Sequence, residues 1–93
     1  MTRRKPRFKK ETHFGGILKT VLFSRIKGDE RKLTSDYDKA SIRFALHHIK
    51  VGHRVSPPVV EKIGENRYRV VDGSHRLIAL KRSGVKKGKV EVV

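Results

Sequence analysis

The residues best suited to chemistry lie in one short segment, Asp72-Gly73-Ser74-His75-Arg76, which follows a predicted strand and opens a predicted helix. Glycine lets a backbone approach a ligand closely. The first amides of a helix have no partner inside it and lie in positive potential. Ser74 and His75 add side-chain donors, and the Arg76 guanidinium is always charged. The segment Gly73–Arg76 therefore predicts a site for a phosphate or another anion.

Two acidic residues are candidates for catalysis. Asp72 ends the strand before the turn, where a carboxylate could hold a metal ion, orient a hydroxyl or act as a general base. Glu30, in a polar connection, is the second candidate. The alternative interpretation is structural: Asp72 or Ser74 caps the helix, Arg76 is a solvated surface group, and Glu30 is a solvated loop residue. From these residues alone both interpretations stay open.

The net charge predicts a polyanionic partner. The 93 residues include 24 Lys and Arg against 9 Asp and Glu, a formal charge of +15. Nucleic acid, with DNA favoured, is the expected polyanion, because neutralising phosphates releases counterions. No basic helix with an exposed apolar face is predicted, so a membrane is not an expected partner. The candidate nucleic-acid contacts form an N-terminal run, Arg3, Arg4, Lys5, Arg7, Lys9 and Lys10, and a second run, Lys81, Arg82, Lys86 and Lys87.

Length and composition exclude several classes of protein. The chain predicts one domain, which excludes a two-domain enzyme, and no window is apolar enough for a membrane span. Without cysteine there are no disulfides, thiolate metal sites or cysteine nucleophiles, and no export signal is evident, so a cytoplasmic protein is expected. The five histidines are scattered, and no metal site is predicted from them. Glutamine is absent and Asn66 is the only asparagine, a composition similar to that of thermophile proteins.

The pattern of apolar residues predicts a small α+β unit with a mixed sheet and two or more helices. Strands are expected over 20–26, 59–63, 67–71 and 89–93. One helix is expected after an N-cap at Ser35, and a second from the glycine turn to Gly84. A basic, flexible arm is predicted over 1–12 and a domain over 13–93. Phe23, Phe44 and Tyr68 are expected in the core; Phe8 and Phe14 are expected to pack on the domain, with base stacking as the alternative.

Residues from about 33 to 93 resemble the ParB/sulfiredoxin superfamily, in particular the ParB-like N-terminal domain. The family pattern is a helix ending in glycine, a P-x-V strand, then a hairpin and helix with the motif y-x-v-x-D-G-x-x-R-x-x-A. The matching residues are Ile49, Gly52, Pro58, Val60, Tyr68, Val70, Asp72, Gly73, Arg76, Ala79 and Gly84.

This resemblance implies a ParB/sulfiredoxin-like fold whose turn binds nucleotide phosphates, with CTP, ATP and ADP as candidate ligands. The turn is similar to GERR in ParB proteins, to GCHR in sulfiredoxins and to a His-Arg form in free serine kinases. Ser74 stands where sulfiredoxins have their catalytic cysteine, and a hydroxyl cannot replace that thiol chemistry. The helix-turn-helix region that follows the domain in ParB partition proteins is absent from this sequence, so we expect backbone-level DNA contact.

Three functions are compatible with these features. The first is a ParB-like, DNA-associated protein that binds a nucleotide or phosphate at Asp72–Arg76. The second is an enzyme of the same superfamily, a nuclease or small-molecule kinase, using Asp72, Glu30 and Mg²⁺. The third is a non-catalytic basic adaptor. The sequence is compatible with a monomer and with a homodimer.

Overall fold

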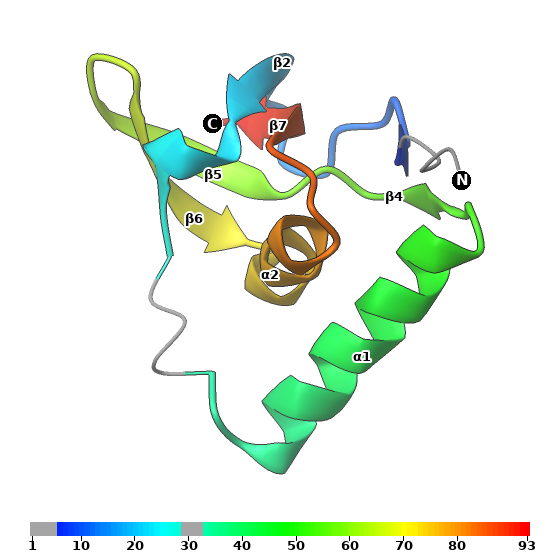
Figure 1. Ribbon diagram of the computed structural model, residues 1–93. Helices are drawn as coiled ribbons and strands as arrows, with labels where there is room; N and C mark the ends of the chain where they lie inside the picture. The colour runs from blue at the N-terminus through cyan, green and yellow to red at the C-terminus, as the bar shows by residue number, and fades with distance from the viewer. Residues whose placement is uncertain (1–5, 29–32) are drawn as a thin grey trace.

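The computed structural model describes residues 6–28 and 33–93 and has the expected α+β architecture (Figure 1). The strands are β1 (Arg7–Phe8), β2 (Ile17–Leu22), β3 (Ile26–Lys27), β4 (Arg54–Val55), β5 (Val59–Gly64), β6 (Arg67–Asp72) and β7 (Lys87–Val92); the helices are η1 (Phe23–Arg25), α1 (Asp36–Lys50) and α2 (Ser74–Arg82). A mixed five-stranded sheet has the order β2-β7-β5-β6-β3, and β1 pairs with β4 in a small parallel sheet.

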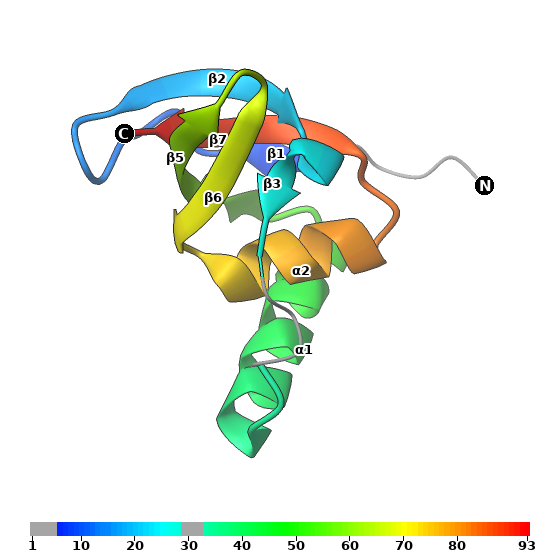
Figure 2. The same ribbon diagram turned by 90° about the vertical axis from the view of Figure 1, so that its left-hand side faces the viewer.

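The five-stranded sheet is strongly curled, which the sequence did not indicate. The single strand expected over 20–26 is wrong, because the 3-10 helix η1 separates β2 from β3. Only these three residues connect the two strands, yet β2 and β3 lie at opposite edges of the sheet. The break turns Phe23 into the core, where it is 1% exposed. Figure 2 shows the resulting curvature, with β3 tucked below the end of β2.

The expected hairpin and C-terminal strand are confirmed. β5 and β6 are antiparallel, and the turn between them includes Asn66 with a φ of 54°. Tyr68 is buried, whereas Arg67 and Arg69 point to solvent, as the alternation predicts. β7 lies between β2, to which it is antiparallel, and β5, to which it is parallel. The β6 strand therefore delivers Asp72 and the following turn to the start of α2.

The helices form two further layers beneath the sheet (Figure 1). α2 lies between the sheet and α1, and for this reason four consecutive residues, Leu77 to Leu80, are all buried. Such a run cannot face one side only, so it indicates contact on both sides of the helix. Packing of α2 against both layers holds the first turn of α2 in a fixed place relative to α1.

α1 begins where the sequence predicts. The Ser35 side chain accepts a hydrogen bond from the Asp38 amide, and the Asp38 carboxylate accepts one from the Ser35 amide, which forms a reciprocal capping box. Ile42 and Ile49 are buried, as the helical periodicity predicts. The expectation that Phe44 belongs to the core is wrong: it is 67% exposed, because it lies two positions, about 200° around the helix, from the buried Ile42. Phe23 and Tyr68 are buried as expected.

Two contacts attach the N-terminal part of the chain to β7. Phe8 packs against the core beside Gly88, where any Cβ would lie 2.7 Å from the ring of Phe8. The buried Glu91 carboxylate accepts hydrogen bonds from the amides of His13, Phe14 and Gly16, at 2.7 to 2.9 Å.

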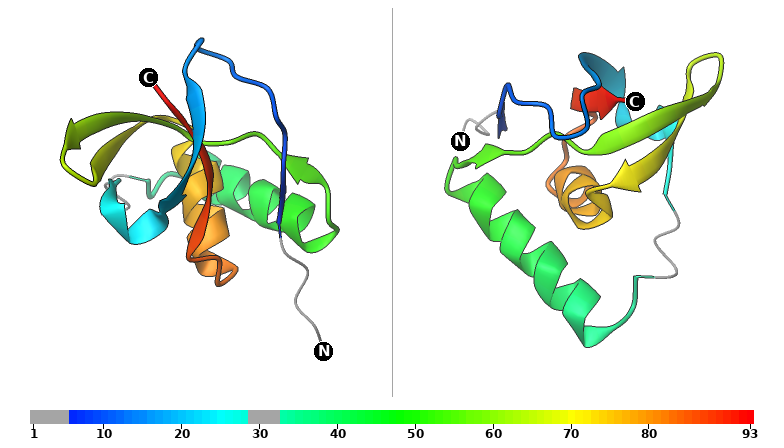
Figure 3. Two further views of the ribbon diagram at one scale, coloured as in Figure 1. Left: turned by 90° about the horizontal axis from the view of Figure 1, so that it is seen from above. Right: turned by 180° about the vertical axis from the view of Figure 1, so that it is seen from behind.

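Residues 6–16 thus run along the domain, as Figure 3 shows for β1 beside β4. Phe8 packs on the domain as expected, but Phe14 is 55% exposed. Residues 1–5 lie outside the described part, and the boundary between a flexible arm over 1–12 and a domain over 13–93 stays a prediction.

Neither α1 nor α2 has the length and apolar character needed to cross a membrane, within the described residues.

Candidate functional site

The turn at the start of α2 has the geometry of an anion site. β6 ends at Asp72, and Gly73, with a φ of 86°, is the N-cap of α2. No side chain caps this helix, so the structural alternative in which Asp72 or Ser74 is the cap is wrong. At the N-terminal end of α2, the first backbone amide to form a helical hydrogen bond is that of Leu77, which donates to the Gly73 carbonyl. The three preceding amides have no acceptor inside the helix and remain available to a ligand.

Arg76 lies over this turn with an unsatisfied donor. Its Nε is buried and has no hydrogen-bond partner among residues 6–28 and 33–93. The guanidinium bends back toward Gly73, so that a Cβ at Gly73 would be only 2.7 Å from Nη2 of Arg76. A buried donor without an acceptor costs free energy, and for a charged group the cost is larger. An oxyanion at the turn would supply the missing acceptor.

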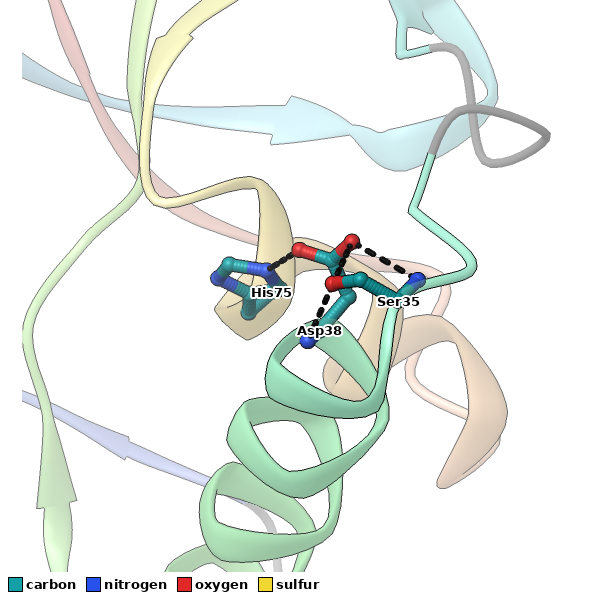
Figure 4. Close-up of polar contacts among 3 residues, drawn as sticks. All are labelled: Ser35, Asp38 and His75. Carbon is teal, nitrogen blue, oxygen red and sulfur yellow. Dashed lines mark hydrogen bonds and ion pairs between the residues drawn. The ribbon is translucent and has the colours of Figure 1, made fainter.

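His75 is held by a residue that sequence analysis did not connect with the site. Its Nε2 lies 2.8 Å from Oδ1 of Asp38, and the other oxygen of that carboxylate contacts Ser35 (Figure 4). The hydrogen bond from Ser35, followed by that from His75, holds the pKa of Asp38 below its usual value. The His75 ring is therefore engaged by α1 on one side, and the ring of Tyr37 meets it edge-on with centroids 5.9 Å apart.

A groove of about 590 Å³ extends from this turn along α1. Tyr37 and Phe44 provide aromatic surface on the α1 side, and Arg54 adds a second guanidinium from β4. Both arginines, Arg54 and Arg76, line the groove, and no Asp or Glu is among its described lining residues. A groove lined by two guanidinium groups and by aromatic rings suits a ligand that combines an anion with a flat, apolar group.

Of the two acidic candidates, the structure describes only Asp72, which does not join this groove. Asp72 is exposed, forms no side-chain hydrogen bond with the described residues and is not among those lining the groove. Glu30 lies outside the described residues. Across 6–28 and 33–93, no three His, Asp or Glu side chains are grouped so that they could hold a metal ion.

The candidate nucleic-acid residues fall into described and undescribed groups. Arg3, Arg4 and Lys5 lie outside the described residues. Because Phe8 packs beside Gly88, the flanking residues of β1 lie near the start of β7. We call the exposed residues of this region, Arg7, Lys9, Lys86 and Lys87, the β1–β7 basic surface. Lys10 is also exposed, and Lys81 and Arg82 lie in the last turn of α2.

Comparisons with known proteins agree with the fold. The family model described as the ParB N-terminal domain matches residues 7–93. A search of the curated proteins gives no match. Among solved structures, sulfiredoxin from Arabidopsis thaliana is similar with a TM-score of 0.64 and 18% identity, covering 83% of this chain and 84% of that chain.

Two larger proteins contain a similar fold. The chromosome-partitioning protein ParB from Caulobacter crescentus, C-terminally truncated and complexed with CTP-gamma-S, has a TM-score of 0.61 and 16% identity, over 84% of this chain and 44% of that chain. A free serine kinase in complex with ADP has a TM-score of 0.63 and 20% identity, over 99% of this chain and 35% of that chain. The present chain thus spans less than half the length of either protein.

The expected superfamily and its α+β fold are both confirmed by these matches. Since the family model extends over residues 7–93, nearly the whole sequence, the chain belongs to the family of ParB N-terminal domains.

Proposed function

We propose that this protein binds a nucleotide, with the phosphates at the Gly73–Arg76 turn and the base along the aromatic wall of the adjoining groove. The buried, unpartnered Nε of Arg76 carries the proposal, because it lies beside free helix amides and needs an acceptor. The ParB protein of similar fold that is complexed with CTP-gamma-S supports it.

The chemistry of the groove fits the two parts of a nucleotide. Amides of Ser74, His75 and Arg76 would donate to phosphate oxygens, and the Arg76 guanidinium would balance their charge. Arg54 adds positive potential from the other wall, and Tyr37 and Phe44 offer ring faces for the base. In this arrangement His75 contributes its amide, whereas its ring, bonded to Asp38, orients the turn.

The test compares nucleotide binding by matched arginine variants. Labelled CTP, ATP and ADP are titrated onto the wild-type chain, Arg76→Ala and Arg82→Ala. Arg82 lies on the same helix, is exposed and carries the same charge, so its removal controls for net charge. At physiological salt, Arg76→Ala should weaken binding roughly tenfold to a hundredfold, as expected for hydrogen bonds to a charged group. Equal affinities for the two variants, or no binding to the wild type, would refute the proposal.

We further propose that DNA binds the β1–β7 basic surface. The supporting observation is the contact between Phe8 and Gly88, since it joins two basic runs that are about eighty positions apart in the sequence. Contiguous exposed cations attract the phosphate backbone without reading its bases. This function is separate from nucleotide binding, because the residues of the basic surface do not line the groove.

Salt-dependent binding to duplex DNA tests the second proposal. The slope of log affinity against log salt should become less steep by roughly 0.9 for each phosphate contact removed. We expect this change in Lys86→Glu/Lys87→Glu. The control is Lys62→Glu/Arg67→Glu, which makes the same charge change on the exposed β5–β6 hairpin. Identical losses in the two double variants would show that net charge alone drives binding and would overturn the assignment of this surface.

The enzymatic alternative depends on Asp72 and makes a distinct prediction. A Mg²⁺-dependent nuclease or kinase activity that is lost in Asp72→Asn would favour an enzyme. Because Asp72 is exposed and does not line the groove, the same variant should bind nucleotides as the wild type does. The adaptor alternative requires neither activity nor nucleotide binding, and saturable binding of a nucleotide would exclude it.

A further inference from the structure

Two histidines at the C-terminal end of α1 bring two ring nitrogens within bonding distance of each other. Nδ1 of His48 and Nδ1 of His53 lie 2.7 Å apart. When one ring carries its proton on Nδ1 and the other does not, the first donates an N–H···N hydrogen bond to the second. A metal ion that displaces this proton would have both nitrogens as ligands.

The end of the helix imposes this arrangement. α1 ends at Lys50, and Gly52 follows with a φ of 80°, a conformation that reverses the chain without strain only for glycine. The amide of His53 then donates to the carbonyl of His48 at 3.0 Å, which fixes the two backbones relative to each other. The Phe44 ring packs on His48, with centroids 4.3 Å apart, and limits the movement of that imidazole.

We propose that His48 and His53 form a two-ligand site for a divalent transition-metal cation, with Ni²⁺ or Cu²⁺ preferred. Imidazole nitrogens are ligands that these cations favour, and Mg²⁺ does not. No group of three or more ligands exists in the described part of the chain, so water would complete the coordination sphere. The proposal does not depend on the proposed nucleotide function, although His48 also lines the groove.

The distance between the two nitrogens favours one type of coordination. Two nitrogens about 2.05 Å from a metal lie roughly 2.9 Å apart at a right angle and roughly 3.3 Å apart in a tetrahedron. The observed 2.7 Å is below both values, so a bound metal must spread the two rings, and it must spread them less for the right-angle arrangement typical of tetragonal Ni²⁺ and Cu²⁺ sites. Zn²⁺, which prefers a tetrahedron, should bind the same pair more weakly than Ni²⁺.

His47 provides a matched control. It is adjacent to His48 on α1 and is exposed, but its ring centroid lies 5.9 Å from that of His48, compared with 4.9 Å for the His53 ring. Replacing His47 therefore removes one imidazole from the same helix without touching the proposed ligands. Since His53 is also exposed and His48 half-buried, substitutions by Gln should leave the fold intact, which circular dichroism can verify.

The experiment titrates Ni²⁺, Zn²⁺ and Mg²⁺ onto the full chain without a histidine tag, by calorimetry. One equivalent of Ni²⁺ should bind the wild type and His47→Gln, Zn²⁺ should bind more weakly, and Mg²⁺ should not bind. His48→Gln and His53→Gln should each lose the saturable site, because a single imidazole does not chelate. Binding should also weaken on acidification, since only bare nitrogens ligate.

Paramagnetic Ni²⁺ gives a second readout that locates the ion. The proton resonances of the His48 and His53 rings should broaden together and before those of His13, His47 and His75. Failure of the wild type to bind Ni²⁺ would show that the pair holds only a proton and would overturn the proposal. Binding that survives in both His48→Gln and His53→Gln would overturn it as well.

Discussion

Nε2 of His75 lies 2.8 Å from Oδ1 of Asp38, and this contact joins the first turn of α2 to the first turn of α1. Asp38 has a second task in the same place, because its other oxygen completes the capping box with Ser35. One carboxylate therefore starts one helix and orients the first turn of the other (Figure 4). The relationship fixes the turn from Gly73 to Arg76 relative to the aromatic wall of the groove.

Two substitutions separate these tasks of Asp38. Ser35→Ala removes the cap and should cost about 1 kcal/mol of stability, while the partner of His75 remains. Asp38→Asn removes the charge opposite His75 and should weaken nucleotide binding as well. Chemical denaturation measures the first effect and nucleotide titration the second. If Asp38→Asn binds nucleotides as tightly as Ser35→Ala does, the contact does not orient the site.

Replacing Gly73 should damage both stability and binding. Its φ of 86° strains any residue with a Cβ, and that Cβ would meet the Arg76 guanidinium at 2.7 Å. Gly15 is a matched control, with a φ of 68° and nothing within 4 Å of an added Cβ. Gly15→Ala should cost roughly 1 to 2 kcal/mol for backbone strain. Gly73→Ala should cost at least as much and should also abolish nucleotide binding; retained binding would contradict the proposed role of Arg76.

Gly88 should tolerate no side chain, because Phe8 and Phe23 surround it. An added Cβ would lie 2.7 Å from the Phe8 ring and 2.9 Å from the Phe23 ring. Gly88→Ala should destabilise the domain by about 1 to 3 kcal/mol through overpacking. It should also expose the Lys9 amide, which donates to the Val55 carbonyl, to hydrogen exchange. Gly28→Ala, whose Cβ would meet Val70 at 3.7 Å and no other described residue within 4 Å, should change neither measurement.

Glu91 makes the stability of the domain depend on acid pH. Burial alone would raise the pKa of Glu91, but hydrogen bonds from the amides of His13, Gly16 and Phe14 outweigh it and lower the pKa below 4.5. The ionised form therefore stabilises the fold above pH 4.5, and this contribution is lost as the pH falls through the lowered pKa.

The predicted result is a melting temperature for Glu91→Gln that is several degrees below the wild-type value at neutral pH. The difference should shrink progressively below pH 4.5. Glu65→Gln, in the exposed hairpin turn, should follow the wild-type curve throughout. A constant difference between Glu91→Gln and wild type at all pH values would show that the charge of Glu91 does not stabilise the fold.

Sequence patterns predicted the elements that have local signals. The alternation from Arg67 to Val71 identified a half-buried strand, and Ser35 identified the start of α1. The run over 20–26 has no glycine or proline to mark the break at η1, and only the requirement to bury Phe23 while curling the sheet explains it. Aromatic character alone placed Phe44 in the core, although its face of α1 borders the groove.

In the candidate site, too, sequence patterns predicted the residues with a local signal and missed those brought in by the fold. The turn from Gly73 to Arg76 is contiguous, so its residue types indicated anion binding without any tertiary information. Asp38 and Arg54 reach the site only through the packing of α1 and β4, and no spacing in the sequence pairs Asp38 with a histidine 37 positions away. The partner of a side chain across a tertiary contact depends on the fold as a whole.

The most direct test of the nucleotide proposal observes the turn itself by nuclear magnetic resonance. CTP, ATP or ADP is titrated onto uniformly ¹⁵N-labelled protein, and each backbone amide and the Nε–H of Arg76 is followed. The account predicts saturable shifts that are largest for Ser74, His75 and Arg76, together with a downfield shift of that Nε–H as it gains an acceptor. Unchanged resonances at the turn, while amides elsewhere respond to the nucleotide, would contradict it.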